Sequence, residues 1–128
     1  MKIEHIAFWV ADLELMKNFY VNYFGGKASK RYHNSAKQFS SYFIVFDEGC
    51  RLELMHKPDI TDKPDNSKQY IGLTHFSVSV GSKNAVRQLT EQLKTDGYTV
   101  KSDPRTTGDG YYESVILDPE GNFVEIAE

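Results

Sequence analysis

The sequence has little cysteine, no long apolar run and no surplus of one charge, and each shortage excludes a class of protein. Its 128 residues include one cysteine, Cys50, which rules out an internal disulfide framework and favours a reducing cytoplasm. No apolar run approaches the roughly 20 residues that a membrane-spanning helix needs, so we expect no membrane partner. The first residues, MKIEHI, lack the apolar core and cleavage site of a signal peptide.

The charge balance is close to neutral and slightly acidic. Fifteen Lys and Arg face eighteen Asp and Glu, for a formal net charge of -3, and no basic face stands out, so nucleic acid is not an expected partner. A small molecule is the better expectation. Aromatic residues make up 13% of the chain, which is typical of a rigid core or of a ligand cavity. The length and the 40% apolar content suit one compact domain, or two small modules that share a core.

One pattern of predicted elements occurs twice along the chain. In the first half, alternation of apolar and polar residues predicts strands at residues 3–10, 39–46 and 50–55. Helical spacing predicts a helix between the first two of these strands, beginning after Asp12 and stopping at Gly25. In the second half, a strand at 73–80 precedes a helix between Ser82 and Gly97, followed by strands near 98–102, 111–117 and 122–127. We therefore predict an internal duplication: module one at 1–56, a linker at 57–71 and module two at 72–128.

Helical spacing of apolar residues predicts which side of each helix is buried. The predicted stripe of the first helix consists of Leu15, Met16, Phe19, Tyr20, Tyr23 and Phe24. That of the second consists of Ala85, Val86, Leu89 and Leu93. Each stripe is expected to cover one face of a sheet.

Strand alternation separates the side chains of each predicted sheet into two kinds. One face is bulky and apolar and would lie under the helices; it carries Ile6, Phe8, Val10, Leu52, Leu54, Phe76, Val78, Val80, Val124 and Ile126. The opposite face carries two histidines and two glutamates at matched places in the two halves: His5, Glu53, His75 and Glu125. His5 and His75 are each third in their strands, and Glu53 and Glu125 each follow a glycine by four residues.

These four residues form a candidate metal site. Taken singly, each is an ordinary solvent-facing residue of a half-exposed sheet. Together, imidazole and carboxylate donors in equal number suit Zn, Ni, Co, Mn or Fe(II), with positions left for water or substrate. Such an open site favours catalysis, since a metal acidifies bound water and polarises a substrate oxygen. The other histidines, His33 and His56, lack this pairing and are expected to be solvated.

The segments that carry these residues resemble the vicinal oxygen chelate superfamily, which includes glyoxalase I, bleomycin-resistance proteins, epimerases and extradiol dioxygenases. The resemblance covers essentially the whole chain and rests on four segments in order: HIAFWVADLELMKNFYVNYFGG, RLELM, LTHFSVSV and LDPEGNFVEI. It implies an α+β fold in which two tandem βαβββ modules form a cupped mixed sheet with helices on the outer face. It also implies a homodimer and a single glyoxalase-like domain over 1–128.

By the same resemblance, His5, Glu53, His75 and Glu125 match the metal ligands of glyoxalase I, which uses Zn or Ni. In that mechanism a metal-associated glutamate moves a proton between adjacent carbons of a 2-oxoaldehyde thiol adduct, so Glu53 or Glu125 is the expected catalytic base. Three hypotheses remain open. The chain is a metal-dependent glyoxalase I-like lyase or isomerase, another enzyme of the superfamily (an epimerase or Fe(II) dioxygenase), or a sequestering protein of the bleomycin-resistance type.

Two positions depart from bacterial glyoxalase I, where an Arg and an Asn contact glutathione. Trp9 stands four residues after the first ligand and Lys57 four after the second. Trp9 would line a pocket, whereas Lys57 is expected to be a solvated lysine. Arg51 shares the face of Glu53 and would bind an anionic substrate group or pair with an acid.

A second candidate contact region is the segment 104–113, PRTTGDGYYE. Its two glycines permit unusual backbone angles, and Arg105, Tyr111 and Tyr112 would close over a ligand. The alternative is a plain hairpin loop.

Overall fold

The computed structural model describes residues 1–61 and 71–128, and the chain divides into two compact units, Met1–Pro64 and Asp65–Glu128. We call these units module one and module two and describe each by itself. Most of the linker predicted at 57–71 lies outside the described residues, so the predicted domain boundaries stay predictions. Among the described residues, no helix has the length and apolar character needed to cross a membrane.

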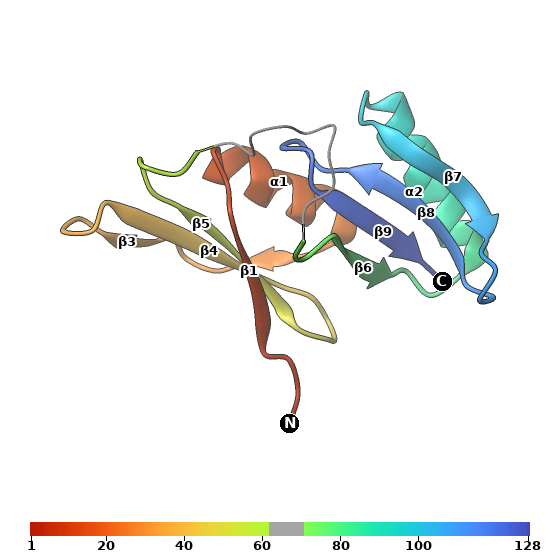
Figure 1. The fold of residues 1–128 in the computed structure, drawn as a ribbon, viewed down its shortest axis with the longest axis horizontal. Helices are drawn as coiled ribbons and strands as arrows, with labels where there is room; N and C mark the ends of the chain where they lie inside the picture. The colour runs from red at the N-terminus through yellow and green to blue at the C-terminus, as the bar shows by residue number, and fades with distance from the viewer. Residues whose placement is uncertain (62–70) are drawn as a thin grey trace. The chain divides into compact units, whose positions relative to one another are not determined.

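Module one is a mixed sheet with one helix (Figure 1). Its elements are β1 (His5–Trp9), α1 (Leu13–Phe24), β2 (Lys27–Ala28), β3 (Tyr32–Asn34), β4 (Phe39–Val45) and β5 (Arg51–His56). The strand order is β1-β5-β4-β2, and β3 also pairs with β4. β1 runs parallel to β5, while the other pairs are antiparallel. α1 packs on β4 and β5.

Module two repeats this plan with one strand fewer (Figure 1). Its elements are β6 (His75–Ser79), α2 (Lys83–Thr95), β7 (Val100–Thr106), β8 (Tyr112–Leu117) and β9 (Phe123–Ala127). The strand order is β6-β9-β8-β7, with β6 parallel to β9 and the other pairs antiparallel. α2 packs on β7, β8 and β9. The predicted α+β class with two βαβββ-like modules is therefore confirmed, with one mixed sheet in each module.

The duplication extends to the pairing register of the strands. In module one Ala7 lies opposite Glu53, and in module two Ser77 lies opposite Glu125. Ala7 and Ser77 are 70 residues apart in the sequence, and Glu53 and Glu125 are 72 residues apart, which are the two offsets that the sequence spacing predicts. Matched residues of the two modules therefore occupy matched positions in the two sheets.

The helix-covered face of each sheet forms the core of its module. The fully buried apolar side chains of module one include Val10, Met16, Phe19, Tyr20, Ile44 and Leu54, and those of module two include Val86, Leu93, Ile116, Val124 and Ile126. On the opposite face His5, Trp9 and His75 are exposed. The two faces predicted from alternation are thus the two faces observed.

The helix caps agree with the prediction, but the buried stripes differ in part. The Asp12 side chain accepts hydrogen bonds from the backbone N–H groups of Glu14 and Leu15, and Gly25 ends α1 in the left-handed conformation. Leu13 is buried in α1, whereas Leu15 is 45% exposed. The predicted stripe was therefore wrong at Leu15.

In α2 the buried residues are Val86, Thr90 and Leu93, and Leu89 is only half buried. Thr90 is accommodated because its hydroxyl donates to the Val86 carbonyl at 2.6 Å and bonds to Ser114 at 2.6 Å. An apolar pattern does not reveal a buried hydroxyl whose partner is distant in sequence.

Two segments expected to be irregular are strands. The polar connection after α1 contains β2 and β3, which pair with β4 as short edge strands. β7 continues to Thr106, so Pro104 and Arg105 lie in a strand and not in a loop. Proline is tolerated there because β7 is an edge strand whose register with β8 is interrupted at two places.

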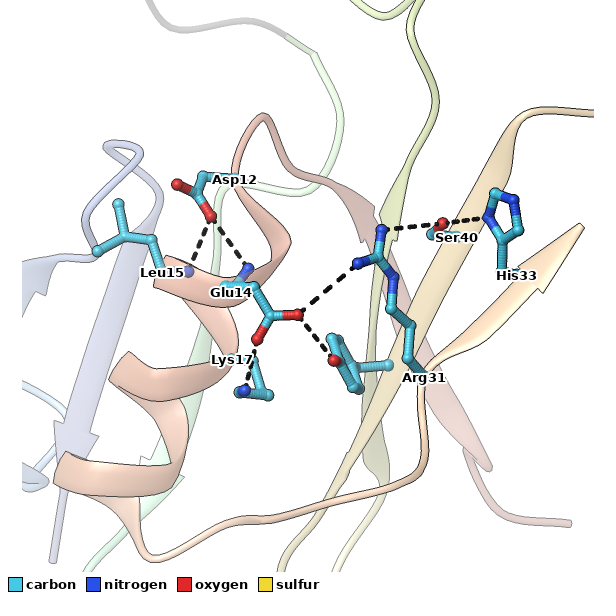
Figure 2. Close-up of polar contacts among 8 residues, drawn as sticks. Asp12, Glu14, Leu15, Lys17, Arg31, His33 and Ser40 are labelled. Carbon is cyan, nitrogen blue, oxygen red and sulfur yellow. Dashed lines mark hydrogen bonds and ion pairs between the residues drawn. The ribbon is translucent and has the colours of Figure 1, made fainter. Parts of the chain in front are cut away.

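A polar cluster around Glu14 ties α1 to the sheet of module one (Figure 2). The Glu14 carboxylate accepts from the Tyr42 hydroxyl at 2.7 Å and from the Lys17 ammonium at 2.6 Å, and it lies 3.9 Å from the Arg31 guanidinium. These contacts lower the pKa of Glu14, chiefly through the Lys17 hydrogen bond. Arg31 also donates to Ser40 at 3.3 Å, so the cluster joins α1, β4 and the chain before β3.

Candidate functional site

In module one, an imidazole and a carboxylate face each other across two neighbouring strands. His5 begins β1 and Glu53 lies in β5, which runs parallel to β1. The His5 Nε2 atom is 3.8 Å from a Glu53 carboxylate oxygen. The side chain of His5 is 39% exposed and that of Glu53 is 16% exposed. The pair is therefore accessible on one side and sheltered by the sheet on the other.

The preceding residue, Glu4, holds the other nitrogen of the same ring. A Glu4 carboxylate oxygen lies 2.5 Å from His5 Nδ1, and Glu4 also pairs with Arg51. The hydrogen bond with His5, followed by Arg51, lowers the pKa of Glu4. Because an ionised carboxylate only accepts hydrogen bonds, Nδ1 carries the proton. In the neutral ring, Nε2 then keeps its lone pair on the side of Glu53, which is the arrangement that metal-binding histidines adopt.

Module two has the equivalent pair. His75 of β6 and Glu125 of β9 lie on adjacent parallel strands, with His75 Nε2 3.4 Å from a Glu125 carboxylate oxygen. Their side chains are 47% and 18% exposed, close to the values of the first pair. Thr74 occupies the position that Glu4 has in module one. In the described part of the chain, His75 therefore has no counterpart of the Glu4 contact.

Glu125 instead has a neighbouring acid, Glu113 of β8. Glu113 lies opposite Ala127, two positions along β9 from Glu125, so the two carboxyl groups share a face. Burial, the negative charge of Glu125 and a hydrogen bond with it raise the pKa of Glu113. Arg105 of β7 lies 3.9 Å from the Glu113 carboxylate and opposes this rise.

The predicted substrate-binding residues fall into two groups. Arg51 of module one pairs with Glu4, and its guanidinium lies 4.1 Å from the centre of the Phe43 ring. Arg105 of module two pairs with Glu113, and Tyr111 is exposed in the turn between β7 and β8. A substrate role for these side chains stays a prediction.

Trp9 lines a cavity of about 570 Å³ in module one. The other lining residues are Tyr32, Asn34, Lys37, Phe39 and Lys57. None of the four predicted metal ligands is among these lining residues. A substrate-binding role for Trp9 therefore stays a prediction. Three of the lining residues lie between residues 30 and 38, a segment that was expected to be only a polar connection.

The remaining histidines are hydrogen-bonded within module one. His33 Nδ1 lies 2.9 Å from the Ser40 hydroxyl, and His56 Nδ1 lies 2.8 Å from the Val10 carbonyl oxygen. His33 is exposed as expected, whereas His56 is half buried. Both rings have structural partners of their own.

The donors of each module fit half of a metal site. Within residues 1–61 and 71–128, no group of three or more His, Cys, Asp or Glu side chains is placed to hold an ion. Each module presents one imidazole nitrogen and one carboxylate oxygen on adjacent strands. Two such pairs would make the mixed nitrogen and oxygen set that divalent Zn, Ni, Co, Mn and Fe accept.

Comparison with known proteins identifies relatives over the whole chain. The Bacillus subtilis protein YqjT, itself uncharacterized, is 28% identical over an alignment of 127 residues, and the match covers 97% of this chain and 96% of YqjT. The trypanothione-dependent glyoxalase I of Leishmania major has 18% identity and a TM-score of 0.79, with 100% of this chain and 86% of that chain covered. Glyoxalase I of Zea mays has 21% identity and a TM-score of 0.77, but 98% of this chain spans only 44% of the maize chain.

The two solved structures share the fold, and a family model covers nearly all of the sequence. Residues 2–126 match the model of the Glyoxalase/Bleomycin resistance protein/Dioxygenase superfamily. The four matched histidine and glutamate residues lie inside this range, and so do all the helices and strands except the last residue of β9. The chain therefore belongs to the Glyoxalase/Bleomycin resistance protein/Dioxygenase superfamily.

Proposed function

We propose that this protein is a metal-dependent lyase or isomerase of the glyoxalase I type, acting on a small oxygenated substrate such as a 2-oxoaldehyde thiol adduct. One observation carries the proposal: the two modules present the same His–Glu pair at the same register, with Nε2 to carboxylate distances of 3.8 and 3.4 Å. Sheet stability does not require this repetition, since any polar residue suits an exposed strand face. The similarity to two glyoxalase I structures supports the choice within the superfamily.

We propose that His5, Glu53, His75 and Glu125 together hold the metal. A divalent cation bound there would polarise a substrate oxygen and acidify the neighbouring C–H group. The two pairs would belong to one chain, or each site would combine module one of one protomer with module two of its partner in a homodimer. Members of this superfamily often dimerise and bind small molecules, so both arrangements are open to test.

Proton transfer would fall to one of the two glutamates. Glu53 and Glu125 are both mostly buried, yet each has an exposed histidine beside it. A carboxylate in such a position can take a proton from a substrate carbon and return it to the adjacent carbon. The surroundings of the two glutamates differ, because Glu125 has Glu113 on its face whereas the matched place in module one is Ser41.

A second candidate function is sequestration of an aromatic compound without chemistry, as in proteins of the bleomycin-resistance type. The observation that favours it is the aromatic cavity at Trp9, which needs no metal. Location in the cytoplasm, expected from the single cysteine, stays a prediction.

Removal of one donor from either module should abolish metal binding. We expect the purified chain to bind one Zn²⁺ or Ni²⁺ ion per chain, and His5→Ala or Glu125→Ala to lose it, because each change leaves a single donor in one module. Calorimetric titration of the metal-free proteins measures this, with His33→Ala as the control histidine outside the pairs. Tight binding retained in both variants would remove the proposed metal site.

Replacement of either glutamate by glutamine should separate the base from the ligand role. With methylglyoxal and glutathione, or another low-molecular-weight thiol, the metal-loaded protein should show lyase activity. The variant that lacks the base should lose about 10²- to 10⁴-fold in kcat, the usual size of general base catalysis. Glu48→Gln, in the exposed turn before β5, is the matched control. No turnover with any thiol adduct would end the lyase proposal, and activity that needs Fe(II) and oxygen would favour a dioxygenase.

Glu4 should matter for metal affinity although it is not a proposed ligand. Glu4→Gln removes the charged acceptor of the His5 Nδ1 proton, and loss of such a partner usually weakens metal binding about 10- to 100-fold. Stoichiometry should not change, and Glu48→Gln should bind as the unsubstituted protein does. An unaltered affinity in Glu4→Gln would show that Glu4 does not support His5.

The Glu113 carboxyl should make stability depend on pH. Its pKa is raised above 4.5 in the folded chain, so the folded state holds this proton more tightly than the unfolded state and stability falls as pH rises above 4.5. Glu113→Gln removes this ionisation. We expect the metal-free variant to be more stable than the unsubstituted chain at neutral pH, with the gain vanishing below pH 4.5. Urea unfolding across pH measures it; equal stability at neutral pH would contradict the burial argument.

A further inference from the structure

We propose that the cavity lined by Trp9 binds a flat aromatic carboxylate, and that it does so without the metal. All six lining residues belong to module one: Trp9, Tyr32, Asn34, Lys37, Phe39 and Lys57. Its volume of about 570 Å³ is within the range of ligand sites. Trp9 stands four residues along β1 from His5, about 13 Å for an extended strand. Such binding rests on the second candidate function proposed above, sequestration at this cavity, and does not depend on catalysis by the His–Glu pairs.

Three aromatic rings form the walls of this cavity. The Trp9 and Phe39 rings meet edge to face with centres 6.2 Å apart, and the Tyr32 and Phe39 rings are tilted with centres 6.0 Å apart. Trp9 and Tyr32 are among the exposed large apolar residues of the chain. Rings left open to solvent around a hollow offer stacking and edge contacts to a flat aromatic ligand.

The charged side chains that line the cavity are all positive. Two lysines, Lys37 and Lys57, line the cavity, and no aspartate or glutamate does. The Lys57 ammonium lies 5.4 Å from the centre of the Trp9 ring and 3.1 Å from the Asp59 carboxylate. In the described part of the chain, Lys37 has no carboxylate partner. Two ammonium groups beside apolar walls select a ligand that carries a negative charge at one end.

The hairpin between β3 and β4 holds the lysine side of the cavity in place. The Asn34 side-chain oxygen accepts a hydrogen bond from the Lys37 backbone N–H at 3.1 Å, and the Gln38 N–H donates to the Ser35 carbonyl at 3.3 Å. Gln38 has a φ of 49°, a left-handed conformation that closes the turn. A fixed turn lowers the entropy lost when a ligand binds.

The cavity is particular to module one and is not a product of the duplication. The residue of module two that matches Trp9 is Ser79, at the end of β6. Serine supplies no ring. The exposed ring of Trp9 therefore does not follow from the strand pattern that the two modules share.

The test uses the metal-free chain of 128 residues, in which Trp9 is the only tryptophan. Its single indole N–H signal in an NMR spectrum reports occupancy of this cavity, while calorimetry measures affinity. The probes are 2-naphthoate, its neutral isostere 2-naphthamide, and acetate. We expect 2-naphthoate to bind and to shift the indole signal, and 2-naphthamide and acetate to bind about tenfold more weakly or not at all, since each lacks one of the two recognised features.

Variants decide whether the binding is at this cavity. Lys37→Gln and Lys57→Gln should each weaken 2-naphthoate about three- to tenfold while leaving 2-naphthamide unchanged, because they remove charge alone. Trp9→Leu should weaken both naphthalene probes. Lys101→Gln, an exposed lysine on β7 of module two, is the control and should have no effect. Equal affinity for 2-naphthoate and 2-naphthamide, or 2-naphthoate binding that leaves the indole signal unmoved, would overturn the proposal.

Discussion

The parallel pairing of the first and last strand of each module is the constraint on which the candidate site depends. It places Ala7 beside Glu53 and Ser77 beside Glu125, so that the histidine two residues earlier reaches the neighbouring carboxylate. The register is held by the other side of the sheet, where Leu52, Leu54, Val124 and Ile126 are buried under the helices. A slip of one residue would turn these apolar side chains to solvent and the glutamates into the core. The packing that buries these apolar side chains therefore also fixes the position of the two glutamates beside their histidines.

The two modules support their pairs in different ways. In module one the histidine is supported, because Glu4 fixes the protonated nitrogen of His5 and is itself held by Arg51. In module two the carboxylate of Glu125 has polar neighbours instead, because Glu113 of β8 lies beside it and Arg105 of β7 pairs with Glu113. The two His–Glu pairs thus occupy matched positions, while the residues around them differ between the modules.

Sequence alone predicted the features that depend on short-range patterns. Alternation separated Glu53 and Glu125 from the buried leucines and valines, and Asp12 and Ser82 cap their helices as expected. Leu15 was placed in the core because helical spacing from Phe19 alone does not show whether Leu13 or Leu15 packs on the sheet. Thr90 was missed because Ser114, which satisfies its hydroxyl, is 24 residues away. Glu113 was missed for the same reason. Glu4 was also missed, although an acid directly before His5 was a visible signal in the sequence.

The central claim is that four donors from two modules serve one ion. X-ray absorption spectroscopy of the Zn²⁺-loaded chain tests this most directly, because multiple scattering from imidazole rings counts the histidines around the metal. The account predicts one zinc per chain with two imidazoles in its coordination shell. Two zinc ions per chain, each with a single imidazole, would contradict it and would mean that each His–Glu pair acts alone.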